Sequence, residues 1–207
     1  MAVHALQSPG SSESDARRVE TSERILDEAE RLFRHYGFGK TTVADIAREL
    51  GMSPANVYRF FPSKSAIHEA IATRMLAMQE VALQRISELP IPAAEKLRRF
   101  VVDRYHSTLA LMIDETKVHE MVTAALDEHW SVIDRHLQRV TEILTHIMEQ
   151  GIAAGEFAAQ DPEAAARGFK VAVVSAIHPS IMAQCRKDPD FPTPEEVADF
   201  AIRALKV

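Results

Sequence analysis

The sequence contains a single cysteine, Cys185, among 207 residues. One cysteine cannot form an intramolecular disulfide or a multi-cysteine metal site, and such scarcity fits a reducing compartment. No apolar run approaches the roughly 20 residues that a membrane-spanning helix needs. The first twenty residues also lack the basic-then-apolar order of a secretory signal peptide. We therefore expect a cytoplasmic protein that has no membrane partner.

Glycine is also scarce, with 7 residues, which favours helices over a β fold rich in turns. Apolar residues recur at helical spacing almost throughout, and no segment shows the alternation of a strand. The first such stripe contains Ile25, Ala29, Leu32 and Phe33, and Gly37 ends it. We predict an all-α fold of about nine helices.

The composition divides the chain into three parts. Residues 1–20 mix Ser, Gly, Pro and charged residues, which predicts a disordered tail with little to bury. Residues 21–66 predict a compact three-helix unit, and its third helix should end before Pro62. Residues 67–207 predict a larger helical bundle.

The net charge of −6 taken alone argues against a nucleic-acid partner, but the charge is unevenly distributed. From Arg31 to Arg74 the chain has seven Lys or Arg and three Asp or Glu, so this stretch carries +4 and the remainder −10. Because solvent and salt screen charges beyond about 8–10 Å, the local balance decides contact with phosphates. The basic stretch therefore suggests a surface that meets a nucleic acid.

Residues 43–61 (VADIARELGMSPANVYRFF) predict two short helices joined by a tight turn at Gly51, which requires a positive φ. In a helix-turn-helix, the second helix places its N-terminal residues in the major groove of DNA. Asn pairs with adenine and Arg with guanine, whereas hydroxyls and ammonium groups suit phosphates. An ordinary αα-corner with solvated charges is the alternative explanation of the spacing. The residues that we expect this second helix to expose are Ser53, Ala55, Asn56, Tyr58 and Arg59.

Residues 37–71 strongly resemble the DNA-binding domain of the TetR family of bacterial transcriptional regulators, and residues 24–38 resemble its first helix. The resemblance is specific over roughly residues 21–71. The family usually has an aromatic residue followed by His where Arg59 and Phe60 stand, which leaves open whether Arg59 adds a contact that relatives lack. The resemblance implies phosphate contacts by Lys40, Thr41, Thr42, Tyr58 and Lys64, and positions at or near base edges for Ser53, Ala55, Asn56 and Arg59.

The resemblance also implies a homodimer through the last two helices, since two copies can read half-sites about 34 Å apart. The helix expected near residues 162–182 is apolar on opposite sides, which suggests burial against its own bundle and against a partner. A central helix in a monomeric core is the alternative, and Pro179 should kink or end this helix near His178. The predicted interface residues are Phe169, Val173, Val197, Phe200, Ala201 and Ala204.

Family members typically bind a small molecule inside the bundle, most often a hydrophobic or aromatic one. Arg104 falls between Val101 and Thr108 on the inward face of its helix, and a buried Arg needs an anion or a carboxylate partner. A structural ion pair, or ordinary core packing for the other residues, is the alternative. The candidate ligand-binding residues are Phe100, Arg104, Tyr105, Met121, Trp130 and His178.

A metal site or another cofactor is not predicted. Glu115 and His119 share a helix face, as do His129 and His136, but spacing places no third ligand beside either pair. The sequence also has no nucleophile elbow, no phosphate-binding glycine loop and no HExxH motif. We therefore expect no enzymatic activity.

These observations predict a dimeric DNA-binding transcriptional regulator, namely a repressor that a small-molecule effector releases from a palindromic operator in double-stranded DNA. An effector-independent DNA-binding protein is the first alternative. An all-α enzyme with a purely structural N-terminal domain is the second.

Overall fold

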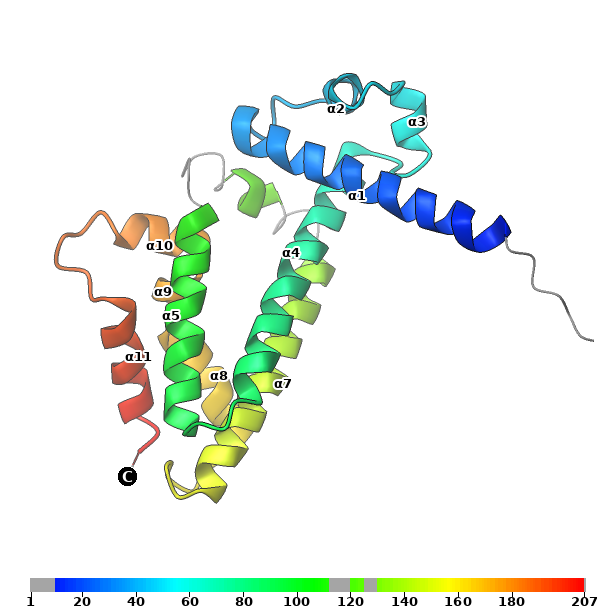
Figure 1. Ribbon diagram of the computed structural model, residues 1–207. Coiled ribbons are helices and arrows are strands. Elements are labelled where there is room, and N and C mark those ends of the chain that lie inside the picture. Colours follow the sequence, from blue (N-terminus) through cyan, green and yellow to red (C-terminus); the bar gives the residue numbers. More distant parts are fainter. Residues whose placement is uncertain (1–9, 112–119, 125–129, 207) are drawn as a thin grey trace, which may run out of the picture. The chain divides into compact units, whose positions relative to one another are not determined.

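The computed structural model describes residues 10–111, 120–124 and 130–206, and the side chains of most of them (Figure 1). The described residues form helices joined by turns and contain no strand, which confirms the predicted all-α fold. The chain divides into two compact units, Met1–Ile71 and Ala72–Val207, so the boundary falls within helix α4 (Lys64–Ser87). None of the described helices has the length and apolar character needed to cross a membrane.

The N-terminal unit contains α1 (Gly10–Tyr36), α2 (Val43–Glu49), α3 (Pro54–Tyr58) and the first turns of α4. Its core is made of side chains that all four helices contribute. These side chains are at most 2% exposed: Ile25, Leu32, Phe33, Ile46, Val57, Ile67 and Ile71.

Helix α1 begins at Gly10, within the stretch that composition assigned to a disordered tail. The side chains of residues 14–20 are all exposed, so this part of the helix contributes nothing to the core. Ala16, Arg17 and Arg18 are good helix formers, and the Thr21 hydroxyl donates to the carbonyl of Arg17 at 2.8 Å. Local propensity therefore extends the helix beyond the part that packing requires.

The turn between α2 and α3 has the predicted chemistry. Gly51 adopts a φ of 65°, and the amide of Met52 donates to the carbonyl of Ala47 at 2.8 Å, which ends α2. At the other end of α2, Thr42 and Asp45 form a capping box. The helix-turn-helix predicted from the sequence is therefore confirmed as a local structure.

The C-terminal unit contains the rest of α4 and six further helices whose bounds the structure gives. Helix α5 packs against α7, α9 and α11, while α8 packs against α7 and α11. The largest fully buried side chains of this unit include Leu97, Leu144, Ile147, Met148 and Met182. The helices are α5 (Ala93–Leu111), α7 (Trp130–Ala153), α8 (Pro162–Ala172), α9 (Val174–Ile177), α10 (Pro179–Cys185) and α11 (Pro194–Arg203).

The segment predicted as one helix over residues 162–182 consists of three helices. The break at His178 follows from Pro179, as predicted, because proline cannot supply the amide donor that a continuous helix needs. A second break at Val173, where φ is −99° and ψ is 5°, was not predicted. It falls in a run of β-branched residues, Val171, Val173 and Val174, whose helix propensity is low.

Candidate functional site

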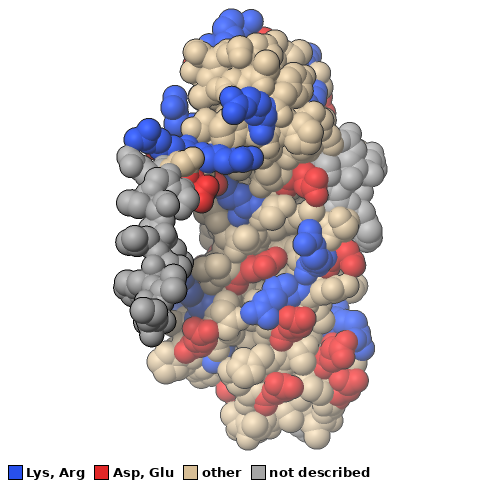
Figure 2. Space-filling view, turned by 90° about the vertical axis from the view of Figure 1, so that its right-hand side faces the viewer, with Lys and Arg blue, Asp and Glu red and all other residues tan. Residues whose placement is uncertain are grey.

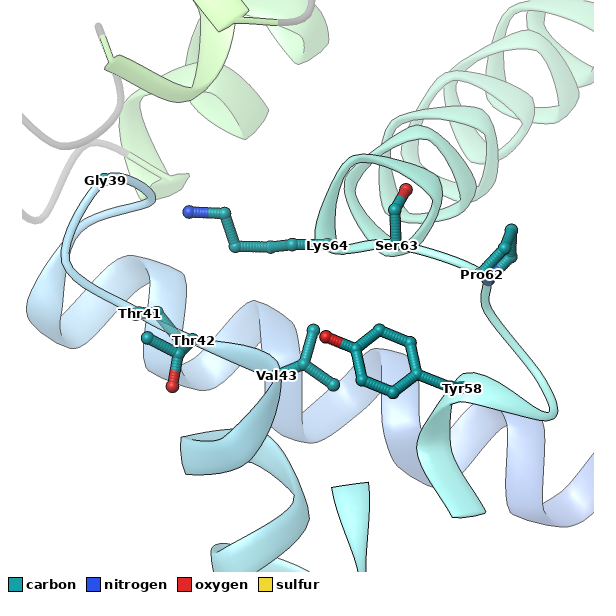
Figure 3. A pocket seen from close by; sticks show the side chains of 8 residues that line it. All are labelled: Gly39, Thr41, Thr42, Val43, Tyr58, Pro62, Ser63 and Lys64. Atoms are coloured by element: carbon teal, nitrogen blue, oxygen red, sulfur yellow. The ribbon is translucent and has the colours of Figure 1, made fainter. Parts of the chain in front are cut away.

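The N-terminal unit has an open depression of about 340 Å³ where the start of α2, the end of α3 and the start of α4 meet (Figure 3). It brings together Thr42, Tyr58 and Lys64, which the sequence places far apart and which all bear polar groups suited to phosphates. On the face drawn in Figure 2, the charged side chains of this unit are mostly basic, whereas both signs alternate over the C-terminal unit. The lining residues are Gly39, Thr41, Thr42, Val43, Tyr58, Pro62, Ser63 and Lys64.

Tyr58 presents an exposed phenol group at the depression. Its side chain is 51% exposed, and Figure 3 shows the ring reaching across toward Val43 with the hydroxyl at its far end. Because Val57 beside it is fully buried in the core, the backbone that carries Tyr58 is firmly anchored. The phenol is therefore held at the surface where the termini of two helices meet.

Thr42 serves first as the cap of α2. Its hydroxyl lies 2.6 Å from a carboxylate oxygen of Asp45, which also accepts from the amide of Thr42 at 2.9 Å. The Thr42 hydroxyl, the Thr42 amide and the Arg48 guanidinium, in that order, lower the pKa of Asp45. The carboxylate can only accept, so the Thr42 hydroxyl donates to it. A phosphate contact by this hydroxyl requires the exchange of that hydrogen bond.

Thr41 is not placed as the resemblance implied. Its side chain is 2% exposed, and its hydroxyl donates to the carbonyl of Gly37 at 2.9 Å. The hydroxyl thus satisfies a carbonyl at the end of α1, where the helix leaves acceptors without partners. The side chain of Thr41 stabilises the α1–α2 connection and does not face solvent.

Lys64 is engaged within its own unit. Its ammonium group donates to the carbonyl of Phe38 at 2.9 Å and lies 4.3 Å from the centroid of the Phe38 ring. In Figure 3 the side chain points from the start of α4 toward Gly39. An ammonium has three donors, so a phosphate contact remains compatible with this bond. Lys64 therefore ties the turn after α1 to α4 as well as carrying a charge into the depression.

The outer surface of α3 carries the predicted base-reading residues. Ser53, Ala55 and Arg59 are exposed, and Asn56 is half-buried. The backbone amide of Asn56 donates to the Ser53 hydroxyl at 3.2 Å. Lys40, in the turn before α2, is also exposed. These positions are accessible to a ligand as large as DNA, and their individual contacts stay predictions.

The bundle brings two of the candidate ligand-binding residues together. Burial lowers the pKa of Arg104 to about 10. Thr108, one turn beyond Arg104 on α5, donates to the carbonyl of Ile177, the residue before His178, at 3.4 Å. Burial and then the positive charge of Arg104 lower the pKa of His178. Phe100 is 6% exposed and belongs to the core, and Tyr105 packs against that core. Met121 is half-buried, and the side chain of Trp130 lies outside the described residues.

His136 and Glu80 form a pair in the bundle that the charge of Arg104 also influences, and no sequence pattern connects them. The Nδ1 atom of His136 lies 2.8 Å from a carboxylate oxygen of Glu80. Burial lowers the pKa of His136, Glu80 opposes that effect, and Arg104 and Lys170 reinforce it. Only the helical register of α4 against α7, which no short motif reveals, places this pair together.

No group of three His, Cys, Asp or Glu side chains that could hold a metal ion occurs among the residues whose placement the structure gives. Of the two pairs considered from spacing, Glu115, His119 and His129 lie outside those residues.

A groove of about 440 Å³ lies between α8 and α11. Its rim includes Phe200, which is 69% exposed, and the exposed small residues Ala164, Gly168, Ala172 and Ala204. Small residues on both helices allow a second surface to approach closely. This groove is therefore an open and largely apolar surface of α8 and α11.

Three of the predicted interface residues are instead part of the bundle's own core. Phe169, Val173 and Ala201 are at most 4% exposed, and Val197 packs against the core with part of its surface. Periodicity identified two apolar faces on these helices but selected the inner face for the partner. Of the predicted set, Phe200 and Ala204 are exposed.

Comparison with known proteins connects both units to one family. Residues 25–71 match the family model described as bacterial regulatory proteins of the tetR family. Residues 93–198, about half of the chain, match the model described as the tetracyclin repressor-like C-terminal domain.

Individual relatives are distant. An uncharacterized HTH-type transcriptional regulator, YhgD of Bacillus subtilis (strain 168), is 23% identical over 153 residues, which cover 70% of this chain and 76% of YhgD. The HTH-type transcriptional regulator SrpR of Pseudomonas putida is 26% identical over 145 residues, 66% of this chain and 65% of SrpR.

Among solved structures, the complex of SmeT with triclosan has a TM-score of 0.65 at 21% identity and covers 89% of this chain and 91% of SmeT. SmeT is the repressor of the multidrug efflux pump SmeDEF of Stenotrophomonas maltophilia. At this level of identity the likeness concerns the fold alone.

The two matches lie in the order in which the structure places its two units, and the first contains the helix-turn-helix whose geometry is described above. The chain therefore belongs to the TetR family of bacterial regulatory proteins and is a DNA-binding transcriptional regulator.

Proposed function

We propose that the protein is a homodimeric repressor that binds a palindromic operator and is released from it by a small-molecule effector. The observation that carries this proposal is the surface formed by α2, α3 and α4, where exposed side chains of α3 adjoin a depression suited to phosphates. We expect the protein to act in the cytoplasm and to catalyse no reaction.

In this proposal α3 enters the major groove. Asn56 and Arg59 are the candidates for base contacts, since their side chains can form paired hydrogen bonds with adenine and guanine. Lys40, Tyr58 and Lys64 are the candidates for phosphate contacts. Helix α3 has only five residues, so each subunit reads few bases, and two subunits are needed for a specific site.

The groove between α8 and α11 supports the homodimer. Phe200 exposes most of a large apolar side chain there, and solvent exposure of such a surface is unfavourable. We propose that the partner covers Phe200 together with the small residues of the rim. The likeness to SmeT, a repressor with a bound small molecule, supports an effector site in the bundle.

The test is binding of the purified protein to DNA from upstream of its own gene, measured by fluorescence anisotropy over a salt series. We expect Asn56→Ala to lose sequence preference at an unchanged salt slope. Lys40→Ala should weaken binding to all sequences and reduce the slope by about one unit, which corresponds to one phosphate contact. Arg99→Ala is the matched control, because it removes an exposed positive charge from the C-terminal unit.

If the wild type and all three variants bind weakly and alike, the operator lies elsewhere, and selection from random DNA then decides. A selection that yields no palindrome contradicts the proposal. An operator complex that no small molecule dissociates would favour the effector-independent protein, and turnover of a substrate that Asn56→Ala leaves unchanged would favour an enzyme.

A further inference from the structure

Helix α5 places a positive charge inside the C-terminal unit. Arg104 lies on the helix face that also carries Val101, which is fully buried, and Thr108, which is 1% exposed. The Thr108 hydroxyl donates to the carbonyl of Ile177 at 3.4 Å, so this face of α5 meets the end of α9. Burial lowers the pKa of Arg104 to about 10, which still leaves the guanidinium charged at neutral pH.

The described residues give Arg104 no carboxylate partner. The acid of this region, Glu80, is bound to His136 at 2.8 Å. The ammonium of Lys170 adds a second positive charge and donates to the Thr141 hydroxyl at 2.7 Å. Arg104 is half-buried, so water solvates its charge only in part. A poorly solvated charge without a partner is unfavourable, so the site favours an anion that the described residues do not supply.

His178 provides a second unsatisfied group beside Arg104. Its Nδ1 atom is buried and has no hydrogen-bond partner within the described residues. The residue stands between α9 and α10, and its side chain makes no capping hydrogen bond to α10. Buried polar atoms in proteins almost always have partners, so an orphaned imidazole nitrogen next to a lone cation indicates a missing polar ligand.

We propose that Arg104 and His178 bind the acid group of the effector, and that the effector is a small organic monocarboxylate with an apolar remainder. This inference rests on the effector-responsive function proposed above. The two parallel donors of the Arg104 guanidinium match the two oxygens of one carboxylate. The buried Phe100 and Val101 on the same helix favour an apolar remainder.

The first test compares acids with neutral analogues of the same shape. Benzoate and benzamide, and octanoate and octanamide, are titrated into the full-length protein by calorimetry. We expect at least one acid to bind at least tenfold more tightly than its amide. Arg104→Met should weaken that acid about 10- to 100-fold and leave the amide within a factor of two, since a hydrogen bond to a charged group has about this effect.

The matched control is Arg99→Met, which removes an exposed arginine from the same helix and should leave binding of the acid unchanged. His178→Ala should weaken the acid less than Arg104→Met does, because the imidazole is neutral. If each acid binds no better than its amide, or if Arg104→Met retains wild-type affinity for the acid, the inference is wrong.

A second test does not depend on which acid binds. Without ligand, Arg104→Met should have a higher melting temperature than the wild type, because an apolar side chain of similar length replaces a buried charge that lacks a partner. At one fixed concentration, the binding acid should raise the melting temperature of the wild type more than that of Arg104→Met, because the variant binds the acid more weakly. A lower melting temperature for unliganded Arg104→Met would show that Arg104 has a structural partner, and would overturn the inference.

Failure of the proposed function is distinguishable from failure of this inference. An acid that binds through Arg104 but does not dissociate the protein from its operator contradicts the effector role and leaves the acid site standing. A neutral molecule that dissociates the operator complex with equal potency in the wild type and Arg104→Met supports the effector role and overturns the acid site.

Discussion

Single side chains in the N-terminal unit serve both the fold and the proposed contact with DNA, and Lys64 illustrates this. Its ammonium interacts with the carbonyl and the ring of Phe38. We predict that Lys64→Met lowers the free energy of unfolding by about 1 kcal/mol, since a charged hydrogen bond and a cation–π contact are lost from a partly exposed site. Thermal unfolding followed by circular dichroism measures this as a melting temperature lower by a few degrees.

The matched variant is Lys40→Met, which removes an exposed lysine of the same unit. Both variants should weaken DNA binding and flatten its salt dependence, but only Lys64→Met should lower the melting temperature. Equal melting temperatures for the two variants would mean that the contact with Phe38 contributes nothing to stability.

Two half-buried histidines in the C-terminal unit, His136 and His178, predict a dependence of stability on pH. Burial is the main cause that lowers the pKa of both His136 and His178 below the ordinary value of 6.5. The charge of Arg104 lowers both pKa values further, whereas Glu80 raises that of His136. The unfolded chain therefore binds these protons more readily than the folded protein does. Their contribution is fully present above pH 6.5 and is lost as the pH falls through the folded-state values.

The measurement is the urea midpoint of the wild type and of His178→Gln at pH 7.5 and pH 5.5. The midpoint of the wild type should fall at the lower pH, and the fall should be smaller in His178→Gln. His146→Gln, which changes an exposed histidine of α7, should reproduce the wild-type fall. An identical fall in all three proteins would rule out a contribution from His178.

At the scale of elements, α7 depends on a glycine for its contact with the chain that follows it. A Cβ atom at Gly151 would lie 2.3 Å from the ring of Phe157 and 2.9 Å from the Cβ of Ala93. We predict that Gly151→Ala lowers the free energy of unfolding by about 1–3 kcal/mol, because the ring is 4% exposed and has little room to move. Urea unfolding monitored by circular dichroism gives the value.

The control for this substitution is Gly168→Ala in α8, where a Cβ would meet nothing within 4 Å in the same subunit. Because Gly168 lies on the rim of the groove that we propose a partner covers, both alanine variants are compared in the Phe200→Glu background, which should leave this groove without a partner. There alanine should stabilise the helix by roughly 0.5–1 kcal/mol, since it restricts the unfolded chain more than glycine does. A destabilisation of equal size at both positions would point to a general effect on helices and not to the space at Gly151.

The segment after α7 shows why Glu156 belongs to the fold. Its carboxylate accepts from the amides of Ala93 at 3.0 Å and Ala94 at 3.1 Å, so it caps α5 from a distant part of the sequence. Gly155, with a φ of 72°, makes the turn that brings it there. No local sequence pattern predicts this cap, because the carboxylate and the two amides belong to distant segments of the chain.

Local signals predicted some of the element boundaries. Gly51 ends a helix and Pro179 breaks one, both as expected from chemistry close in sequence. Thr42 and Thr193 each begin a helix with a capping box, which is likewise formed by residues three apart in the sequence. The break at Val173 was missed because a weak preference of β-branched residues competes with tertiary packing. Thr41 was assigned to a phosphate for a different reason. Its hydroxyl has the chemistry of a phosphate contact, and only the folded chain shows the carbonyl of Gly37 that accepts from it.

At the scale of the whole molecule, the sequence predicted two apolar faces on the last helices but not which face meets a partner. Phe169 and Val173 were assigned to the interface and lie in the core, whereas Phe200 is exposed. Helical periodicity records that a face is apolar, and the same pattern results from burial in either place. Only the packing of α8 against α7 distinguishes the two faces.

This distinction gives the last prediction. Phe200→Glu should weaken the homodimer about 100-fold or more, because the partner would bury a carboxylate without a counter-ion. Sedimentation velocity at micromolar concentration should then show monomers. Since the side chain is 69% exposed within one subunit, the fold and the melting temperature of the monomer should change little. The operator should be bound with the weak affinity of one half-site, because a single α3 reads too few bases for a specific complex.

Val81→Glu is the control. Val81 is also an exposed apolar side chain, at 51%, but it belongs to α4 and does not line the groove. It should leave both the dimer and operator binding unchanged. If Phe200→Glu still sediments as a dimer, the partner covers a different surface, and the exposed Val171 and Val174 on α8 and α9 become the next positions to charge. If instead the variant is monomeric yet binds the full operator as tightly as the wild type does, two reading helices are not required, and the dimeric mode of recognition is wrong.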